Sequence, residues 1–130
     1  MAQELNLAGR KLVQVALTVK DLDRARAFYR DTLGLPLMFE AGHMLFFDIG
    51  GQRLMVGLAE KPGQAVGGTY IYFDAPDVAA LSAELKAKGV ELIGGIETLQ
   101  RTETHELKLQ FFKDPDGNEM GLMGMVPKAA

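Results

Sequence analysis

The sequence repeats one order of strands and a helix twice, and this repeat constrains the fold more than any other feature. Strand-like segments centred near Gln14 and Tyr70 are offset by 56 residues (70 − 14). The glycines that end the two predicted helices, Gly34 and Gly89, are offset by 55 (89 − 34). Two offsets that agree within one residue indicate a duplicated unit, and a unit of this size is a supersecondary motif.

The first unit reads strand, helix and three strands. Residues 11–19 are apolar and β-rich, with polar residues on one parity, which is typical of a strand. Asp21 is an N-cap candidate, apolar residues then recur at helical spacing, and Gly34 takes the C′ position. The following strands are predicted at residues 37–40, 43–49 and 53–58, separated by the glycine turns 41–42 and 50–51.

The second unit repeats this order after a Gly- and Pro-rich segment, 61–68. Residues 69–75 read as a strand, Asp77 caps the next helix and Gly89 ends it. Three further strands are predicted at residues 90–96, 106–112 and 119–123, the last preceded by the turn 114–118. This half has about ten extra residues, which we place in residues 94–106, around the predicted loop that contains His105.

The predicted fold class is therefore α+β, with two βαβββ modules in a single domain that spans residues 1–130. The first module covers residues 11–60, the linker 61–68 and the second module 69–126. A five-stranded sandwich and a ferredoxin-like fold are structural alternatives, but neither predicts two strand-helix-three-strand halves with a glycine after each helix.

Composition excludes several classes of function. The 14 basic and 17 acidic residues leave a net charge of −3 without a basic stripe, so no nucleic acid partner is expected. The absence of cysteine excludes thiolate metal sites and cysteine nucleophiles. No secretory signal and no apolar run of membrane-spanning length is present, so we expect no membrane association and a cytoplasmic protein.

Three segments resemble the vicinal oxygen chelate superfamily, which includes glyoxalases, bleomycin resistance proteins and extradiol dioxygenases. They are VQVALTVKDLDRARAFYRDTLGL in the first half, YIYFDAPDVAALSAELKAKGVEL in the second and FFKDPDGNEMGLM near the end. The resemblance implies that each module curls into an open four-stranded sheet and that the two sheets enclose a cavity. It also implies a homodimer, with the modules pairing either within one chain or across two chains.

In the enzymes of this family a divalent metal is bound by the first and last strands of each module. The resemblance places these positions at Gln14, Met55, Tyr70 and Gly121. A divalent ion in such a cavity requires imidazole or carboxylate ligands, and this set supplies only one neutral amide oxygen and a phenol. We therefore expect neither the usual metal nor another cofactor. Glu119 shares the face of Gly121 by strand alternation, although its place directly after a turn favours the solvent edge.

The cavity residues remain as candidates for ligand binding or catalysis. By parity and resemblance the expected ligand-binding residues are Gln14, Met55, Tyr70, Tyr72 and Met123. His105 is added because it lies in the inserted polar segment, which we expect to form a loop over the cavity. Aromatic rings and flexible thioethers suit a small, partly apolar organic molecule. The catalytic candidates are Tyr70, Asp74, His105 and Glu119.

Three functional hypotheses follow from these residues. The first is a metal-free protein that binds a small organic ligand. The second is an enzyme of lyase, isomerase or dioxygenase type that works through acid-base residues. The third keeps an atypical metal site, formed by Gln14, Glu119 and a histidine. Neither the identity of the ligand nor the pairing of the modules follows from the sequence.

Overall fold

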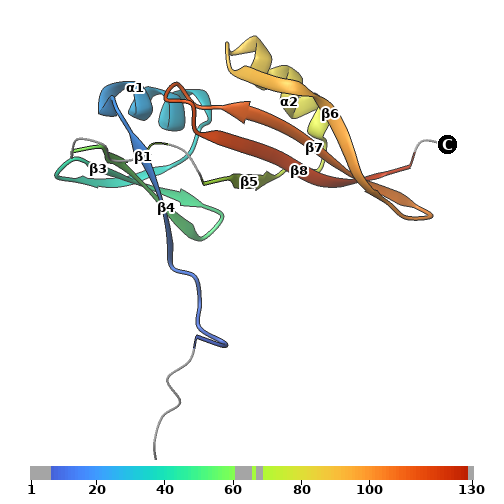
Figure 1. The fold of residues 1–130 in the computed structure, drawn as a ribbon, viewed down its shortest axis with the longest axis horizontal. Coiled ribbons are helices and arrows are strands. Elements are labelled where there is room, and N and C mark those ends of the chain that lie inside the picture. The colour runs from blue at the N-terminus through green and yellow to red at the C-terminus, as the bar shows by residue number, and fades with distance from the viewer. Residues whose placement is uncertain (1–6, 61–65, 67–68, 129–130) are drawn as a thin grey trace, which may run out of the picture.

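The computed structural model describes residues 7–60, 66 and 69–128, and these form two four-stranded sheets with helices on one side (Figure 1). The first module comprises β1 (Gln14–Val19), α1 (Leu22–Arg26), the π-helix η1 (Ala27–Thr32), β2 (Leu37–Ala41), β3 (Met44–Ile49) and β4 (Gln52–Leu58). The second comprises β5 (Ile71–Asp74), α2 (Val78–Ala87), β6 (Glu91–Arg101), β7 (His105–Lys113) and β8 (Glu119–Pro127).

The two sheets have the same topology. Their strand orders are β1-β4-β3-β2 and β5-β8-β7-β6, and in each the first strand pairs in parallel with the last while the other neighbours are antiparallel. This confirms the predicted α+β fold of two βαβββ modules. Most of the predicted linker, 61–65 and 67–68, lies outside the described residues.

The predicted caps fix where each helix begins and ends. The side chains of Asp21 and Asp77 accept hydrogen bonds from the backbone N–H groups of Arg24 and Ala80, both at 3.0 Å. Gly34, which follows the first helix, has a φ of 74° that only glycine adopts without strain. The prediction of one continuous α-helix before Gly34 was wrong, because the chain widens into a π-helix from Ala27 onward.

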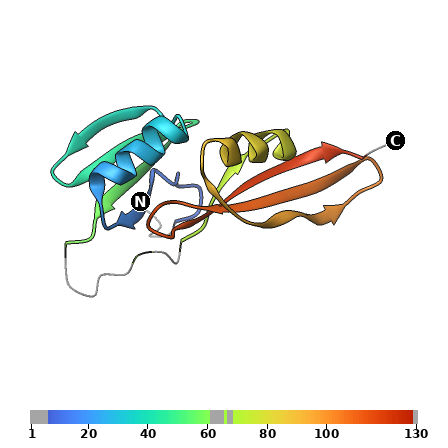
Figure 2. The ribbon, with the colours of Figure 1, turned by 90° about the horizontal axis from the view of Figure 1, so that it is seen from above.

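Strand alternation sorts the side chains of each sheet into a helix-facing set and an outward set. In β1, Leu17 and Val19 are buried beneath the helices, whereas Ala16 lies exposed on the other face. One hydrophobic cluster joins helix-facing residues of both modules, from Phe47 and Tyr29 to Phe112 and Met120. Figures 1 and 2 show the helices of both modules on the same side of the two sheets.

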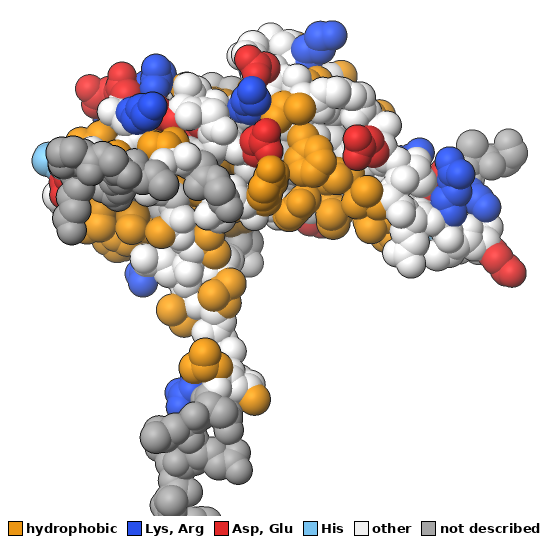
Figure 3. Space-filling view, in the orientation of Figure 1, with side chains coloured by type: hydrophobic (Ala, Val, Ile, Leu, Met, Phe, Trp, Pro, Cys, Tyr) orange, Lys and Arg blue, Asp and Glu red, His pale blue; other side chains and the backbone are white. Residues whose placement is uncertain are grey.

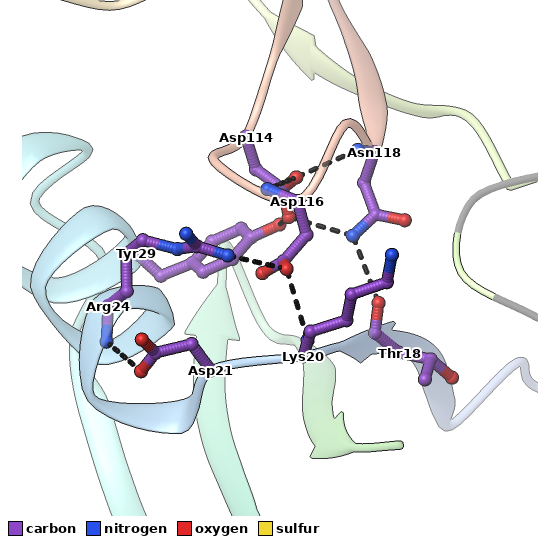
Figure 4. A network of polar contacts seen from close by, with 8 residues as sticks. All are labelled: Thr18, Lys20, Asp21, Arg24, Tyr29, Asp114, Asp116 and Asn118. Atoms are coloured by element: carbon purple, nitrogen blue, oxygen red, sulfur yellow. Dashed lines mark hydrogen bonds and ion pairs between the residues drawn. The ribbon is translucent and has the colours of Figure 1, made fainter. Parts of the chain in front are cut away.

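A buried polar network fastens the turn before β8 to the first module (Figure 4). The hydroxyl of Tyr29 donates to Asp114 Oδ2 at 2.7 Å. The amide of Asn118 donates to the same oxygen at 2.8 Å and to the carbonyl of Thr18 at 3.1 Å. Because the bonds Tyr29–Asp114 and Asn118–Thr18 cross from one module to the other, they set the position of one sheet relative to the next.

A second part of this network lies nearer the surface. Asp116 Oδ1 accepts from Arg24 Nη2 at 2.7 Å and from the backbone N–H of Lys20 at 3.1 Å (Figure 4). The turn 114–118, which the sequence explains only as a chain reversal, therefore also joins the modules. Burial and the neighbouring carboxylate of Asp114 raise the pKa of Tyr29 well above its ordinary value.

The extra residues of the second module form a long hairpin and not a loop over a cavity. β6 continues to Arg101, five residues beyond its predicted end, and β7 begins at His105. The reason is local: Thr102 accepts the backbone N–H of His105 through its hydroxyl at 2.9 Å and closes a tight turn. The hairpin extends away from the first module (Figure 1).

Candidate functional site

The sheet face opposite the helices is the candidate site, because it carries large side chains that the core does not bury. Tyr70 and Tyr72 are 52% and 47% exposed, and Met44 and Met125 also lie exposed there. Hydrophobic side chains gather below α2 over β5, and further ones lie along the N-terminal segment that leaves the body of the protein (Figure 3). A single chain thus leaves this face open.

One hollow lies on the first sheet and has a volume of about 360 Å³. Met55 and Thr18 line it, with His43 and Glu60 at its edge. His43 Nδ1 lies 2.5 Å from Glu60 Oε1, and both side chains are exposed.

Another hollow, of about 310 Å³, lies on the second sheet. It brings together Tyr72, Asp74 and Met123, which are three of the residues singled out in the sequence, with Leu107 and Met125 as apolar walls. Asp74 stands at the exposed end of β5, opposite Met123 in the β5–β8 pairing.

The third hollow lies where the two modules meet and has a volume of about 350 Å³. Tyr72 from β5 and Tyr70, which directly precedes β5, line it together with Gln52 and Arg53 from β4. Gln14, which pairs with Arg53 in the parallel β1–β4 register, is half-buried beside it. Sequence reasoning missed Gln52 and Arg53. The only available signal was that Arg53, two residues before Met55, lies on the same face of its strand, the face predicted to line the cavity.

The four positions that the family uses for metal binding are placed equivalently in the two sheets. Met55 pairs with Ala16, two residues beyond Gln14, and Gly121 pairs with Tyr72, two residues beyond Tyr70. This equal offset supports the mapping. None of the four residues carries an imidazole or a carboxylate.

The space that a metal ligand at position 121 would need is filled by other side chains. A Cβ on Gly121 would lie 2.8 Å from Cδ1 of Tyr72 and 3.0 Å from Cδ1 of Leu109. Within residues 7–60, 66 and 69–128 no group of three or more His, Cys, Asp or Glu side chains is arranged to hold a metal ion. The donors at these positions do not fit the metal that the family's enzymes use.

Tyr70 and Glu119 form a pair on the second sheet. A hydrogen bond to the Glu119 carboxylate, together with its negative charge, raises the pKa of Tyr70 above its ordinary value. Tyr70 therefore stays protonated at neutral pH. Glu119 is half-buried at the start of β8, so its place at the solvent edge or at the site stays a prediction.

His105 lies apart from the other candidates. It is exposed at the start of β7, where its ring nitrogen Nδ1 is 2.8 Å from Oγ1 of Thr104, and it pairs with Pro127 at the far end of the second sheet. None of the three hollows described above includes it. Its role in ligand binding stays a prediction.

Known proteins share this arrangement. The sequence profile of the Glyoxalase/Bleomycin resistance protein/Dioxygenase superfamily matches residues 11–122. The chain belongs to this superfamily.

Particular relatives include "Glyoxalase 1" of Caenorhabditis elegans, which is 23% identical over 119 residues, 88% of this chain; the chain spans only 42% of that protein's length. The uncharacterized protein YraH of Bacillus subtilis is 27% identical over 135 residues that cover 89% of this chain and 99% of the relative. The crystal structure of a lactoylglutathione lyase from Agrobacterium tumefaciens superposes with a TM-score of 0.74 at 24% identity, over 90% of this chain and 95% of that one.

No helix in the described part of the chain is long and apolar enough to cross a bilayer.

Proposed function

We propose that this protein binds a small, partly apolar organic molecule on the open sheet face, without the divalent metal that the family's enzymes hold there. The proposed ligand-binding residues are Gln14, Met55, Tyr70, Tyr72 and Met123. The observation that carries the proposal is the replacement of metal ligands by packing: Gly121 has no side chain, and Tyr72 and Leu109 occupy the space beside it.

The chemistry of the remaining face supports an organic ligand. The two tyrosines line the hollow where the two modules meet, which we call the junction hollow. Tyr72 also lines the neighbouring hollow on the second sheet, together with Met123. Aromatic rings and thioethers favour flat or irregular apolar ligands, and hollows of 300–400 Å³ are at the small end of known ligand sites. This size suits a metabolite or a drug fragment.

We further propose that the site is enclosed in a cytoplasmic homodimer built from two copies of the single domain of residues 1–130. Side chains that are apolar and more than one-third exposed gather on the sheets and on the N-terminal segment, among them Leu12, Met38, Phe39 and Leu99. A contiguous exposed apolar surface is a common sign of association. A second copy laid over this face would cover these side chains and close the hollows.

A ligand screen with thermal unfolding as the readout tests the proposal. Saturating amounts of a true ligand raise the midpoint because the ligand binds only the folded protein. We expect small aromatic and heterocyclic molecules to raise it in the presence of a chelator, and Tyr72→Ala to reduce the shift. The control is Arg30→Gln, which alters an exposed residue on the helix side, away from the face. A broad library that stabilises the protein nowhere contradicts the proposal.

The contact between Tyr70 and Glu119 favours a second candidate, an enzyme that uses Glu119 as a general base. A carboxylate beside a protonated phenol provides a base and a hydrogen-bond donor on one side of a bound substrate. Turnover of a ligand found in the screen, followed by NMR, tests this candidate. Loss of turnover with unchanged affinity in Glu119→Gln supports it, and unchanged turnover in that variant excludes it.

A further inference from the structure

We propose that the junction hollow between β4 and β5 is a carboxylate site, in which Arg53 binds the acid group of a flat organic anion that lies against Tyr70 and Tyr72. This inference rests on the proposed function and specifies its ligand class: an aromatic or otherwise planar monocarboxylate.

The first step concerns the guanidinium of Arg53, which has no anionic partner in the described part of the chain. Its Nε is fully covered by protein atoms and yet makes no hydrogen bond to any described residue. Asp48 is its partner in the β3–β4 register, but the carboxylate of Asp48 accepts the backbone N–H of Gly51 at 3.0 Å. Arg53 is half-buried and its buried Nε donor has no partner, so an anion that accepts a hydrogen bond from Nε offsets the cost of burying that donor.

The second step concerns how Arg53 is held. Its Cζ lies over the ring of Phe46 at 5.6 Å from the centroid. That stacking fixes the plane of the guanidinium while leaving its edge for a ligand, and an arginine held in this way matches the two oxygens of a carboxylate better than a single point charge does.

Gln52, the preceding residue of β4, has its side chain on the opposite, helix-facing side by strand alternation, so it is not a second donor to the same ligand group. Its Nε2 is buried without a hydrogen-bond partner, like Arg53 Nε, and both residues line the hollow. Four other arginines, Arg24, Arg26, Arg30 and Arg101, form ion pairs with carboxylates. The unpaired Nε of Arg53 therefore distinguishes it from the arginines that form ion pairs.

The opposite wall determines what is attached to the carboxylate. Tyr70 and Tyr72 bring two aromatic rings to the hollow, and its volume of about 350 Å³ accommodates a single ring. Glu119, hydrogen-bonded to Tyr70, places a negative charge at the second-sheet end of this wall. A second acid group on the ligand would be repelled there, which favours a monocarboxylate.

Titration of the full chain with benzoate and with benzamide tests the inference. The two probes share ring and size and differ in charge, and ¹H–¹⁵N NMR reports the affinity and the side-chain Nε–H of arginine directly. We expect benzoate to bind about tenfold more tightly than benzamide, since a charge-assisted pair replaces a neutral hydrogen bond. Acetate, which lacks the ring, should bind more weakly than benzoate.

Variants of Arg53 assign the effect. Arg53→Gln should remove the preference for benzoate and leave the affinity for benzamide within about twofold, because the rings of Tyr70 and Tyr72 are untouched. Arg53→Lys should retain part of the preference, because it keeps the charge without the fork. Arg30→Gln, on the helix side, is the matched control and should leave both affinities unchanged.

Different failures are distinguishable. Equal affinities for benzoate and benzamide in the unaltered protein overturn the carboxylate site and leave the proposed function intact. Failure of both probes, with other molecules of the screen still bound, also overturns the carboxylate site alone. An Arg53→Gln variant that weakens self-association while benzoate has no effect shows that a second copy supplies the anion, which overturns the inference as well.

Discussion

Replacing Tyr29 by phenylalanine tests how firmly the two modules are joined. The side chain is fully buried, and its hydroxyl donates to Asp114 Oδ2 at 2.7 Å. Removing the hydroxyl deletes a hydrogen bond to a charged acceptor, which contributes about 1.5–3 kcal/mol. Asp114 retains donors from the Asn118 side chain at 2.8 Å and from the backbone N–H groups of Asp116 and Asn118, so the loss falls near the lower part of that range.

We therefore expect Tyr29→Phe to lower the free energy of unfolding by about 2 kcal/mol. With a urea m-value of about 2 kcal/mol per molar, the midpoint moves down by about 1 M. Measurements at one fixed protein concentration keep self-association constant. Tyr72→Phe is the matched control, because the same atom is removed from a residue that is 47% exposed. If both variants lose less than about 0.5 kcal/mol, the network does not hold the modules together as described.

Three further changes have defined outcomes. Because the pKa of Tyr29 is raised in the folded protein, the stability that the protonated Tyr29 contributes is fully present below the ordinary tyrosine pKa of 10.0. This stability is lost as the pH rises above that value. In urea titrations at alkaline pH, the free energy of unfolding should therefore fall by up to about 1.4 kcal/mol per pH unit more in the unaltered protein than in Tyr29→Phe. Gly124→Ala should lower the free energy of unfolding by about 3 kcal/mol or prevent folding, because its Cβ would overlap the backbone carbonyl of Ala75. Gly121→Ala should lower it by about 1 kcal/mol, because the ring of Tyr72 can move. Equal losses for the two variants in thermal unfolding would contradict this reasoning. Arg24→Met should destabilise the protein by about 1 kcal/mol in urea titrations, because the buried Asp116 carboxylate loses its ion pair. The effect is limited to this size because Arg24 is itself about half exposed. An unchanged midpoint would show that this pair contributes nothing.

Local signals in the sequence predicted most of the fold. Aspartate caps, glycines at left-handed positions and strand parity act over a few residues, so the order of elements and the outward position of Tyr70 and Tyr72 could be derived from them. The π-helix could not, because it depends on how the first helix packs against its sheet. The length of the β6–β7 hairpin was missed because a Thr- and Glu-rich segment has the composition of a loop, and pairing with β7 stabilises it as a strand.

The candidate site was only partly predictable. Parity placed the tyrosines and methionines on one face, and the family mapping predicted positions unsuited to a metal. The contact between Tyr70 and Glu119 joins two strands that are distant in sequence, and the lack of a partner for Arg53 is visible only when its neighbours are known. The role of the turn 114–118 in joining the modules likewise depends on Tyr29, 85 residues away along the chain.

Metal content measured by elemental analysis on protein purified without chelator tests the central claim most directly, when paired with thermal unfolding in the presence of added zinc, nickel, iron or manganese. The account predicts far less than one equivalent of any of these metals per chain and no change in the unfolding midpoint on their addition. One bound equivalent with a raised midpoint would contradict it, because Gln14, Met55, Tyr70 and Gly121 could not then be the residues that decide whether a metal binds.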